Sequence, residues 1–229
     1  MLKSTGMSDQ RRGRFITFEG GEGSGKSTQV HLLGAKLKFA GLEAVVTREP
    51  GGTTAGEKIR SILLDRSDDP IAPTTEALLM SAARAEHVAK VIEPGLSRGA
   101  WVLSDRYTDS TYVYQGFARG LKMTALRRIQ DFATNGMEPD LTILLDIETE
   151  VGLARRQRLI DTTNRLDSEA EAFHERVRSG YHSLVARDPA RWLVIDATQS
   201  VDAIADQIWS EVSRRFSAWL SPARRPSQV

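Results

Sequence analysis

The sequence predicts an α/β fold in which a parallel sheet of five strands lies between two layers of helices. Two observations predict it. Five short and almost continuous apolar runs recur along the chain, and stretches with the apolar spacing of helices separate them. Such runs are typical of strands that are buried on both faces, as in parallel sheets covered by helices. The five predicted strands are, in order, Phe15–Phe18, Ala44–Thr47, Trp101–Leu103, Leu141–Leu145 and Trp192–Ile195.

The helices are predicted from apolar residues that recur on one face. The first carries Val30, Leu33 and Leu37, and it ends at Gly41, the residue type that commonly follows the last turn. The other predicted helical stretches are the segment with Ile59, Ile62 and Leu63, about 74–96, about 125–132, a basic stretch from about Glu150, about 170–186, and 201–219. No repeat or linker interrupts this alternation, so we expect one domain over residues 14–220.

Composition is that of an ordinary globular protein, with 229 residues, of which 40% are apolar and 27% charged. The net charge of +1 gives no strong attraction to nucleic acid or to a membrane surface, and no apolar run approaches the roughly 20 residues of a membrane span. The chain has no cysteine, which excludes disulfides and thiol catalysis and fits a reducing compartment, so we expect a cytoplasmic protein. Disordered tails are expected at 1–13 and 221–229, and Met7 is an alternative start to Met1.

A glycine-rich loop joins the first strand to the first helix and fits the pattern G-x-x-x-x-G-K-[ST], which cradles nucleotide phosphates. Its residues are Gly20, Gly21, Glu22, Gly23, Ser24, Gly25, Lys26 and Ser27, followed by Thr28. Backbone amides at a helix start favour an anion, Lys26 is placed to reach the outer phosphates, and Ser27 is placed to bind magnesium. A glycine-rich turn without a ligand is the alternative, and the flanking strand and helix argue against it.

Charged residues follow the second and third strands, at the sheet edge where ligands of such folds bind. Arg48 follows the second strand, and Asp105 and Arg106 follow the third. Two guanidinium groups that converge on one cleft suit a second phosphate group, whereas either arginine alone would be interpreted as a surface ion pair. The guanine-reading motif N-K-x-D of switch GTPases is missing from the sequence.

A basic stretch follows the fourth strand and contains Arg155, Arg156, Arg158 and Arg165, with a polar break at 159–164. One interpretation is a solvated helical hairpin. The other is a mobile lid over about 155–168 that delivers an arginine to the transferring phosphoryl group.

Several segments together make the chain resemble the thymidylate kinase family of the bacterial type, from about Arg14 to Trp219. The matching segments are Phe18–Thr28, Thr47–Thr53 (TREPGGT), Asp105–Ser110 (DRYTDS), Tyr114–Gly116 (YQG) and Asn164–Asp167 (NRLD). The strings after the second and third strands are far more selective than the phosphate loop.

The resemblance implies a three-layer fold of the P-loop NTPase type, as in nucleoside monophosphate kinases. It also implies the reaction of ATP with dTMP to give dTDP and ADP, with Mg²⁺, and a homodimer formed through the long helices. The implied catalytic residues are Lys26, Asp105, Arg106 and a lid arginine. The implied residues for ATP and its phosphates are Gly20–Thr28, with Ser27 and Asp105 at the metal. The implied residues for dTMP are Glu22, Arg48, Met80, Arg84, Arg106, Ser110, Tyr114 and Gln115. Adenine would lie between the start of the arginine-rich helix and the loop 196–199.

Two positions depart from patterns found in the family. Gly23 stands where some members carry the catalytic arginine, so we expect that arginine in the lid, with Arg158 the preferred candidate. Met80 stands where an aromatic residue commonly stacks on the base. Residues 80 and 84 share one helix face, and methionine sulfur can still contact an aromatic ring.

Two other function classes stay open: a different nucleoside monophosphate or deoxynucleoside kinase, and a switch protein that hydrolyses ATP slowly. Transfer to a phosphate oxygen, which is already ionised at neutral pH, requires no strong general base. We therefore expect the four histidines to be surface residues, namely His31, His87, His174 and His182.

Overall fold

The computed structural model describes residues 12–65, 70–158 and 169–220. Most of the expected tails, the NRLD segment and the greater part of the expected lid lie outside the described residues. The described chain begins just before β1, where the N–H of Gly13 donates a hydrogen bond to the carbonyl of Leu96 at 2.8 Å.

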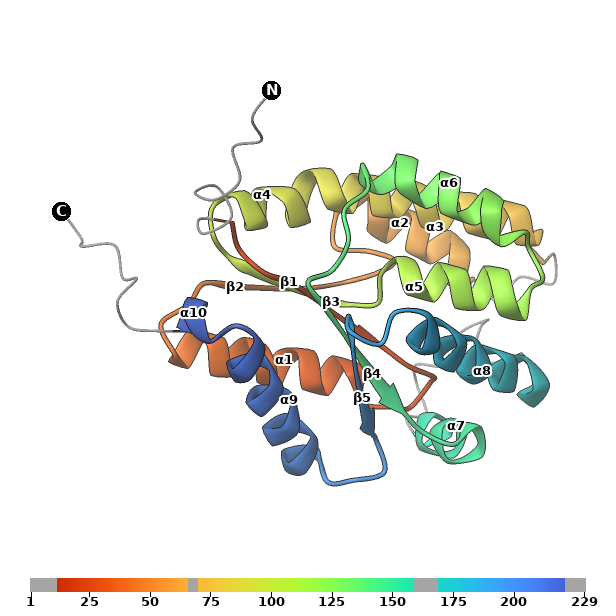
Figure 1. Ribbon diagram of the computed structural model, residues 1–229. Helices are drawn as coiled ribbons and strands as arrows, with labels where there is room; N and C mark the ends of the chain where they lie inside the picture. Colours follow the sequence, from red (N-terminus) through yellow and green to blue (C-terminus); the bar gives the residue numbers. More distant parts are fainter. Residues whose placement is uncertain (1–11, 66–69, 159–168, 221–229) are drawn as a thin grey trace.

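Five parallel strands form one sheet in the order β2-β3-β1-β4-β5, which confirms the predicted sheet (Figure 1). Their bounds are Phe15–Glu19 (β1), Ala44–Arg48 (β2), Trp101–Asp105 (β3), Leu141–Asp146 (β4) and Trp192–Asp196 (β5). Central β1 places Phe18 beside Asp105 of β3 and Glu19 beside Leu144 of β4. The carboxyl ends of these strands therefore meet at one edge, where the glycine-rich loop begins.

The helical segments lie in two layers, one on each side of the sheet (Figure 1). Their bounds are Lys26–Phe39 (α1), Thr54–Leu64 (α2), Pro73–His87 (α3), Val88–Ile92 (η1, a π-helical turn), Glu93–Ser97 (α4), Thr108–Thr111 (α5), Tyr112–Ala118 (η2, π-helical), Met123–Thr134 (α6), Thr149–Gln157 (α7), Glu171–Arg187 (α8), Val201–Arg215 (α9) and Ser217–Leu220 (α10). The long helical stretch expected at 74–96 is thus α3, η1 and α4 in succession.

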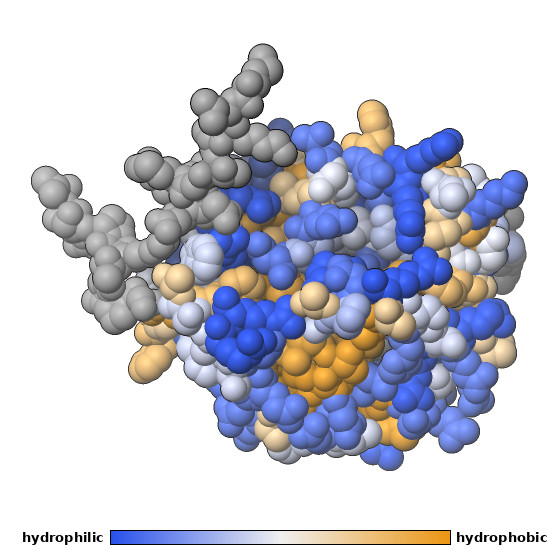
Figure 2. Space-filling view, viewed as in Figure 1, coloured by the Kyte–Doolittle hydropathy of each residue, from blue (hydrophilic) through white to orange (hydrophobic). Residues whose placement is uncertain are grey.

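Alternate residues of β1 face opposite layers, because successive side chains of a strand point to opposite faces. Ile16 and Phe18 pack in the cluster that α1 and α9 form on one face, with Leu33 and Ile208 among its buried members. On the other face Phe15 packs with η1 and α4. Figure 2 shows mostly hydrophilic side chains on the viewed surface, with an apolar patch near the edge strand β5.

The helical segment formed by α5 and η2 was not expected from the sequence. It contains aromatic and β-branched residues, whose helix propensity is low. Val113 and Tyr114 pack there against Phe173 and Tyr181 of α8, in one buried cluster. Tertiary packing therefore overrides local preference, and it turns the face with Tyr114 toward the end of β1.

The expectation of four surface histidines is wrong for two of them. His87 is fully buried, and its ring nitrogens lie 2.6 Å from Thr47 Oγ1 and 2.8 Å from Glu49 Oε1. His174 is also buried and packs edge-on against Phe173. An imidazole can be buried where neighbouring polar or aromatic groups replace its contacts with water. The other two histidines are exposed, as predicted.

Candidate active site

The glycine-rich loop curls around the amine of Lys26 at the start of α1. The Nζ of Lys26 donates hydrogen bonds to the carbonyl oxygens of Gly21 at 2.7 Å and Gly20 at 3.1 Å, and to Ser24 Oγ at 3.2 Å. Burial lowers the pKa of Lys26 to about 8, and the nearby Arg106 charge acts in the same direction. Additional negative charge in the loop would favour the ammonium form, as expected of a phosphate-binding lysine.

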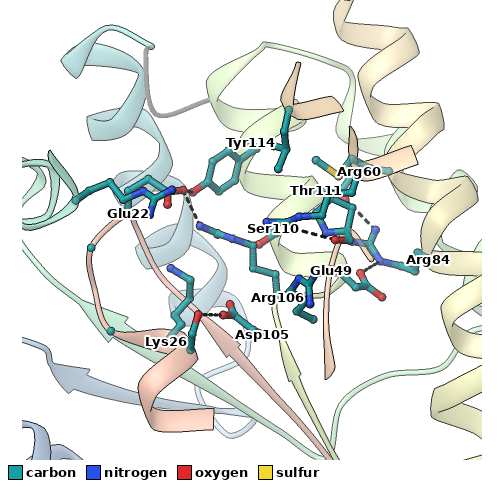
Figure 3. Close-up of a pocket in the computed structure, with 18 of the residues that line it drawn as sticks. Glu22, Lys26, Glu49, Arg60, Arg84, Asp105, Arg106, Ser110, Thr111 and Tyr114 are labelled. Carbon is teal, nitrogen blue, oxygen red and sulfur yellow. Dashed lines mark hydrogen bonds and ion pairs between the residues drawn. The ribbon is translucent and has the colours of Figure 1, made fainter. Parts of the chain in front are cut away.

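Ser27, the second residue of α1, contacts Asp105 at the end of β3, which lies near Lys26 in Figure 3. The hydroxyl of Ser27 donates to Asp105 Oδ2 at 2.5 Å. No cluster of three or more potential protein ligands for a metal ion occurs among residues 12–65, 70–158 and 169–220. One carboxylate and one hydroxyl nevertheless fit Mg²⁺, because this ion is usually held by one or two carboxylates together with substrate phosphates and water.

Arg106 directly follows Asp105 and reaches back toward the loop. Its φ angle of +72° lies in the left-handed region that residues other than glycine rarely adopt. Its guanidinium donates to Glu22 Oε1 at 2.7 Å and to the carbonyl of Gly20 at 3.2 Å, and it lies 4.9 Å from the ring centre of Tyr114. The Tyr114 hydroxyl also donates to Glu22 Oε1, at 2.9 Å (Figure 3). Glu22 thus links the loop to both residues.

The charges around Glu22 keep it ionised. Burial alone would raise its pKa, but the charges of Arg106 and Lys26 and the Tyr114 hydrogen bond outweigh burial and lower the pKa to about 2. At neutral pH the carboxylate therefore accepts hydrogen bonds and does not supply a proton.

Gly23 packs against the backbone of α7. A Cβ atom at position 23 would lie 2.0 Å from the carbonyl oxygen of Gly152, and the φ of Gly23 is +68°. Both the close approach and the backbone conformation require glycine here. This contact gives a steric reason why the loop position that some family members fill with arginine has no side chain in this chain.

Arg48 lies at the end of β2 and faces the same cavity. It is half-exposed, and its Nη2 donates to both carboxylate oxygens of Glu57 at 2.9 Å. Arg60, which sequence analysis missed, lies one turn of α2 beyond Glu57 and donates to the carbonyl of Pro50 at 2.9 Å. Burial lowers the pKa of Arg60, and Arg48 is a further cause in the same direction. The signal that could have identified Arg60 is its position on the helix that directly follows the TREPGGT segment.

Arg84 of α3 is almost fully buried and forms four hydrogen bonds with protein groups. Its acceptors are Glu49 Oε2 at 2.7 Å, Thr111 Oγ1 at 2.8 Å, Gln130 Oε1 at 2.5 Å and the Tyr107 carbonyl at 2.9 Å. A guanidinium has five N–H groups, so these four bonds leave one for a ligand. The amide nitrogen of Gln115 similarly donates to Glu76 Oε1 at 2.7 Å, and both residues of this pair are buried.

The arginines at the end of α7 differ in position. Arg155 and Arg156 line the cavity, whereas Arg158, the residue after α7, lines a second, shallower hollow that Arg155 also borders. The guanidinium of Arg155, in the last turn of α7, donates to the carbonyl of Ala197 at 2.8 Å, so the end of the arginine-rich helix and the loop 196–199 are in contact. Arg165 lies outside the described residues.

The structure brings most of the predicted residues to one cavity of about 380 Å³, a volume within the usual range of small-molecule sites. The predicted residues that line it are Glu22, Gly23, Gly25, Lys26, Ser27, Thr28, Arg48, Met80, Arg84, Asp105, Arg106, Ser110, Tyr114 and Gln115. Gly20, Gly21, Ser24 and Arg158 are not among its lining residues, although the first three form the loop around Lys26. Cavity residues that were not predicted as site residues are Glu49, Pro50, Arg60, Leu64 and Thr111.

A phosphate loop on a parallel sheet, facing a second group of arginines across one cavity, defines a kinase of the nucleoside monophosphate type. The family model described as "Thymidylate kinase" matches residues 18–208. The chain belongs to the thymidylate kinase family, and the predicted family is thereby confirmed.

Curated relatives named thymidylate kinase resemble the chain over nearly their whole length. One from Thermomicrobium roseum is 55% identical over 199 residues, which cover 87% of this chain and 94% of the relative. Another, from Alkalilimnicola ehrlichii, is 46% identical over 92% of this chain and 97% of the relative. A third, from Rhodopseudomonas palustris, is 45% identical over 98% of this chain and 97% of the relative. Every helix in the described ranges is too short or too polar to span a membrane.

Proposed function

We propose that the protein transfers the γ-phosphoryl group of ATP to dTMP, giving dTDP and ADP, on the route to dTTP. Membership of the thymidylate kinase family supports the reaction and both substrates. The assignment of residues rests on two cations that line one cavity, Lys26 in the phosphate loop and Arg106 after β3. Glu22 lies between them: it accepts a hydrogen bond from Arg106, and the charges of both cations lower its pKa.

On the donor side, we assign the loop Gly20–Thr28 to the ATP phosphates, with Lys26 at the outer phosphates. Ser27 and Asp105 would hold Mg²⁺, and their contact at the loop entrance supports this assignment. When bound, the ion would neutralise part of the phosphate charge. Adenine would lie between the start of α7 and the loop 196–199, and the contact of Arg155 with Ala197 supports this assignment only in placing α7 next to that loop.

On the acceptor side, Arg48 and Arg106 would bind the phosphate of dTMP, and Arg60 would be a third cation in reach. Arg48 is bonded to the exposed carboxylate of Glu57, and such a pair is weak enough in water for a phosphate to replace it. The Arg106 guanidinium also donates a hydrogen bond to the loop carbonyl of Gly20. This bond would keep the guanidinium between the proposed sites for the ATP phosphates and the dTMP phosphate.

The remaining assigned side chains surround the deoxyriboside. Tyr114 would pack beside the sugar near Glu22, while Met80 and Arg84, one helical turn apart on α3, would face the thymine. Arg84 would offer its remaining N–H to the base, and Gln115 and Ser110 complete the assigned set. The fixed positions of Arg84 and Gln115 suit a site that rejects bases with a different pattern of polar atoms.

The proposed mechanism consists of positioning and charge neutralisation. The attacking atom is a phosphate oxygen that is already ionised, so no residue has to remove a proton from it. The described residues supply cations on both sides of the transfer path, and a lid arginine would add charge stabilisation at the transferring group. Arg158 remains the predicted lid arginine. Arg156 is a second candidate, because it lines the cavity.

The test is an assay of ADP release with dTMP, dUMP, dCMP, AMP and GMP as acceptors. We expect dTMP to be the best acceptor, with dUMP next, because the two differ by one methyl group. A preference for AMP, GMP or dCMP would show that the protein is a different nucleoside monophosphate kinase. ADP release that does not depend on any acceptor would favour the ATP-hydrolysing switch.

We also propose a homodimer that forms through the long helices of one layer, namely the layer that contains α2, α3 and α6 (Figure 1). Three helices of this layer each expose a large apolar side chain: Ile62 on α2, Leu78 on α3 and Phe132 on α6. Analytical ultracentrifugation should find a dimer that Phe132→Ser weakens. Phe39→Ser is the matched control, because Phe39 is equally exposed but lies at the end of α1. A monomeric wild type would refute the dimer. The cytoplasmic location expected from the sequence remains a prediction.

A further inference from the structure

Glu19, at the carboxyl end of β1, is a fully buried acid that lies in the matching segment Phe18–Thr28 but has no assigned role, and it is not among the residues that line the cavity. Its Oε1 accepts a hydrogen bond from the backbone N–H of Tyr107 at 2.8 Å. Its Oε2 accepts two more, from the hydroxyls of Ser110 at 2.6 Å and Tyr181 at 2.7 Å. Because burying a carboxylate is costly, three converging donors at this point require an explanation.

The two hydroxyls that donate to Glu19 also contact Arg106. Its Nη1 lies 3.2 Å from Ser110 Oγ and 3.2 Å from the Tyr181 oxygen. A hydroxyl has a single proton. The two hydroxyl oxygens also lie 3.1 Å from each other, so either could donate to the other instead of to Glu19. When each hydroxyl donates to the Glu19 carboxylate, its oxygen lone pairs are free to accept from Arg106.

We propose that Glu19 is a positioning residue for the acceptor phosphate: its carboxylate orients the hydroxyls of Ser110 and Tyr181 so that they hold the Arg106 guanidinium in the cavity. This rests on the proposed role of Arg106 in binding dTMP. Tyr181 extends the site to α8, an element from which the motifs of the family supply no residue. Neither Glu19 nor Tyr181 touches the substrate, and both act through Arg106.

The charges around Glu19 make the arrangement sensitive to pH. Burial and the neighbouring charge of Asp109 raise the pKa of Glu19 to about 7, against the opposing effects of Arg106 and the two hydroxyl donors. Lys26 of α1 is the other cation whose charge couples to Glu19. A proton on the carboxyl group removes the negative charge that the three donors face, and hydrogen bonds to a charged acceptor are about twice as strong as neutral ones. We therefore expect Arg106 to be held less firmly below about pH 7.

The experiment compares kcat/KM for dTMP in wild type and Glu19→Gln between about pH 6 and pH 8.5. We expect the ratio of wild type to variant to be about tenfold or more at pH 8, as for the loss of a hydrogen bond to a charged group. It should fall toward about threefold or less near pH 6, where wild-type Glu19 is also neutral. The second ionisation of the acceptor phosphate, near pH 6, affects both proteins equally and cancels in the ratio.

Two further readouts separate positioning from a general loss of structure. The KM for ATP should stay within about twofold of wild type in Glu19→Gln, because neither hydroxyl is hydrogen-bonded to a residue of the loop Gly20–Thr28. Glu43→Gln, an exposed residue beside β2, is the matched control and should leave both kinetic constants unchanged. If Glu19→Gln fails to fold, Tyr181→Phe serves instead, with a loss of about threefold or more in kcat/KM for dTMP and an unchanged KM for ATP.

A ratio near one at pH 8, a ratio that does not change with pH, or wild-type kinetics in Tyr181→Phe would each overturn this inference. Wild type that fails to phosphorylate dTMP in the same assay would instead refute the proposed function, so the two failures are distinguishable.

Discussion

The contact between the phosphate loop and α7 can be tested with a single methyl group. A Cβ atom at Gly152 would lie 2.4 Å from the carbonyl oxygen of Glu22 and 3.2 Å from Ile147 Cγ2. Ordinary contact begins near 3.4 Å, so Gly152→Ala must separate the loop from the helix by about 1 Å. The same helix carries Arg155 and Arg156 into the cavity, and these side chains must move with it.

Two opposing terms decide the stability of Gly152→Ala. Helix propensity favours alanine over glycine by about 1 kcal/mol. Overpacking costs about 1–3 kcal/mol, and here the clashing atom belongs to the backbone, which cannot rotate away. We expect a net loss of up to about 2 kcal/mol and a Tm lower by up to about 4–8 °C for a chain of this size. Turnover should fall further, because a displacement of about 1 Å in a catalytic site can cost on the order of 100-fold.

Thermal unfolding and steady-state kinetics measure the two effects on the same preparation. Ala154→Gly is the matched control, since it changes helix propensity at an exposed position of α7 without touching the loop. It should lower Tm by a few degrees and leave kcat unchanged. Wild-type kcat in Gly152→Ala, with an equal or higher Tm, would refute the inferred packing of loop and helix.

Three other predictions concern the lid, the base and the loop acid. Arg158→Ala should lower kcat sharply with dTMP affinity near normal, and Arg156→Ala provides the comparison; an unchanged kcat in Arg158→Ala removes that residue from the mechanism. Met80→Phe should tighten dTMP binding or leave it unchanged in calorimetric titration, and a loss of more than about tenfold, roughly 1.4 kcal/mol, would mean that Met80 does not line the base site. Because its pKa is lowered to about 2, ionised Glu22 should stabilise the fold fully above about pH 4.5 and lose this contribution as the pH falls toward 2. In urea unfolding the advantage of wild type over Glu22→Gln should therefore reach about 3 kcal/mol near pH 5 and shrink by pH 3, and a difference independent of pH would contradict it.

The sheet could be predicted because all five strands appear as apolar runs, although only the inner strands β1, β3 and β4 are almost fully buried. Helices such as α1 were predictable because their apolar residues recur at the spacing that places them on one face. The segment from Thr108 to Ala118 was not, since its helical form depends on packing against α8, which is distant in sequence. His87 and His174 were misjudged because the groups that surround them come from other elements.

The candidate site was predictable where its residues follow strands directly. Lys26, Arg48 and Arg106 lie at strand ends or in the loop after a strand, and the fold itself brings them together. Glu19 gave no signal, because an acid at a strand end before a glycine loop is equally compatible with a solvated position. Tyr181 belongs to an amphipathic helix, and only the tertiary structure directs its hydroxyl to Glu19.

We expect a phosphoryl group to pass directly from ATP to dTMP in this cavity. Incubation of the wild-type protein with ATP labelled in its γ-phosphate, with and without dTMP, tests it most directly. We predict one labelled dTDP for each ADP formed, and little ADP without dTMP. In Arg106→Ala the formation of labelled dTDP should fall by on the order of 100-fold or more, as for a buried arginine that pairs with phosphate. Label that appears as inorganic phosphate at the same rate with and without dTMP would contradict the account.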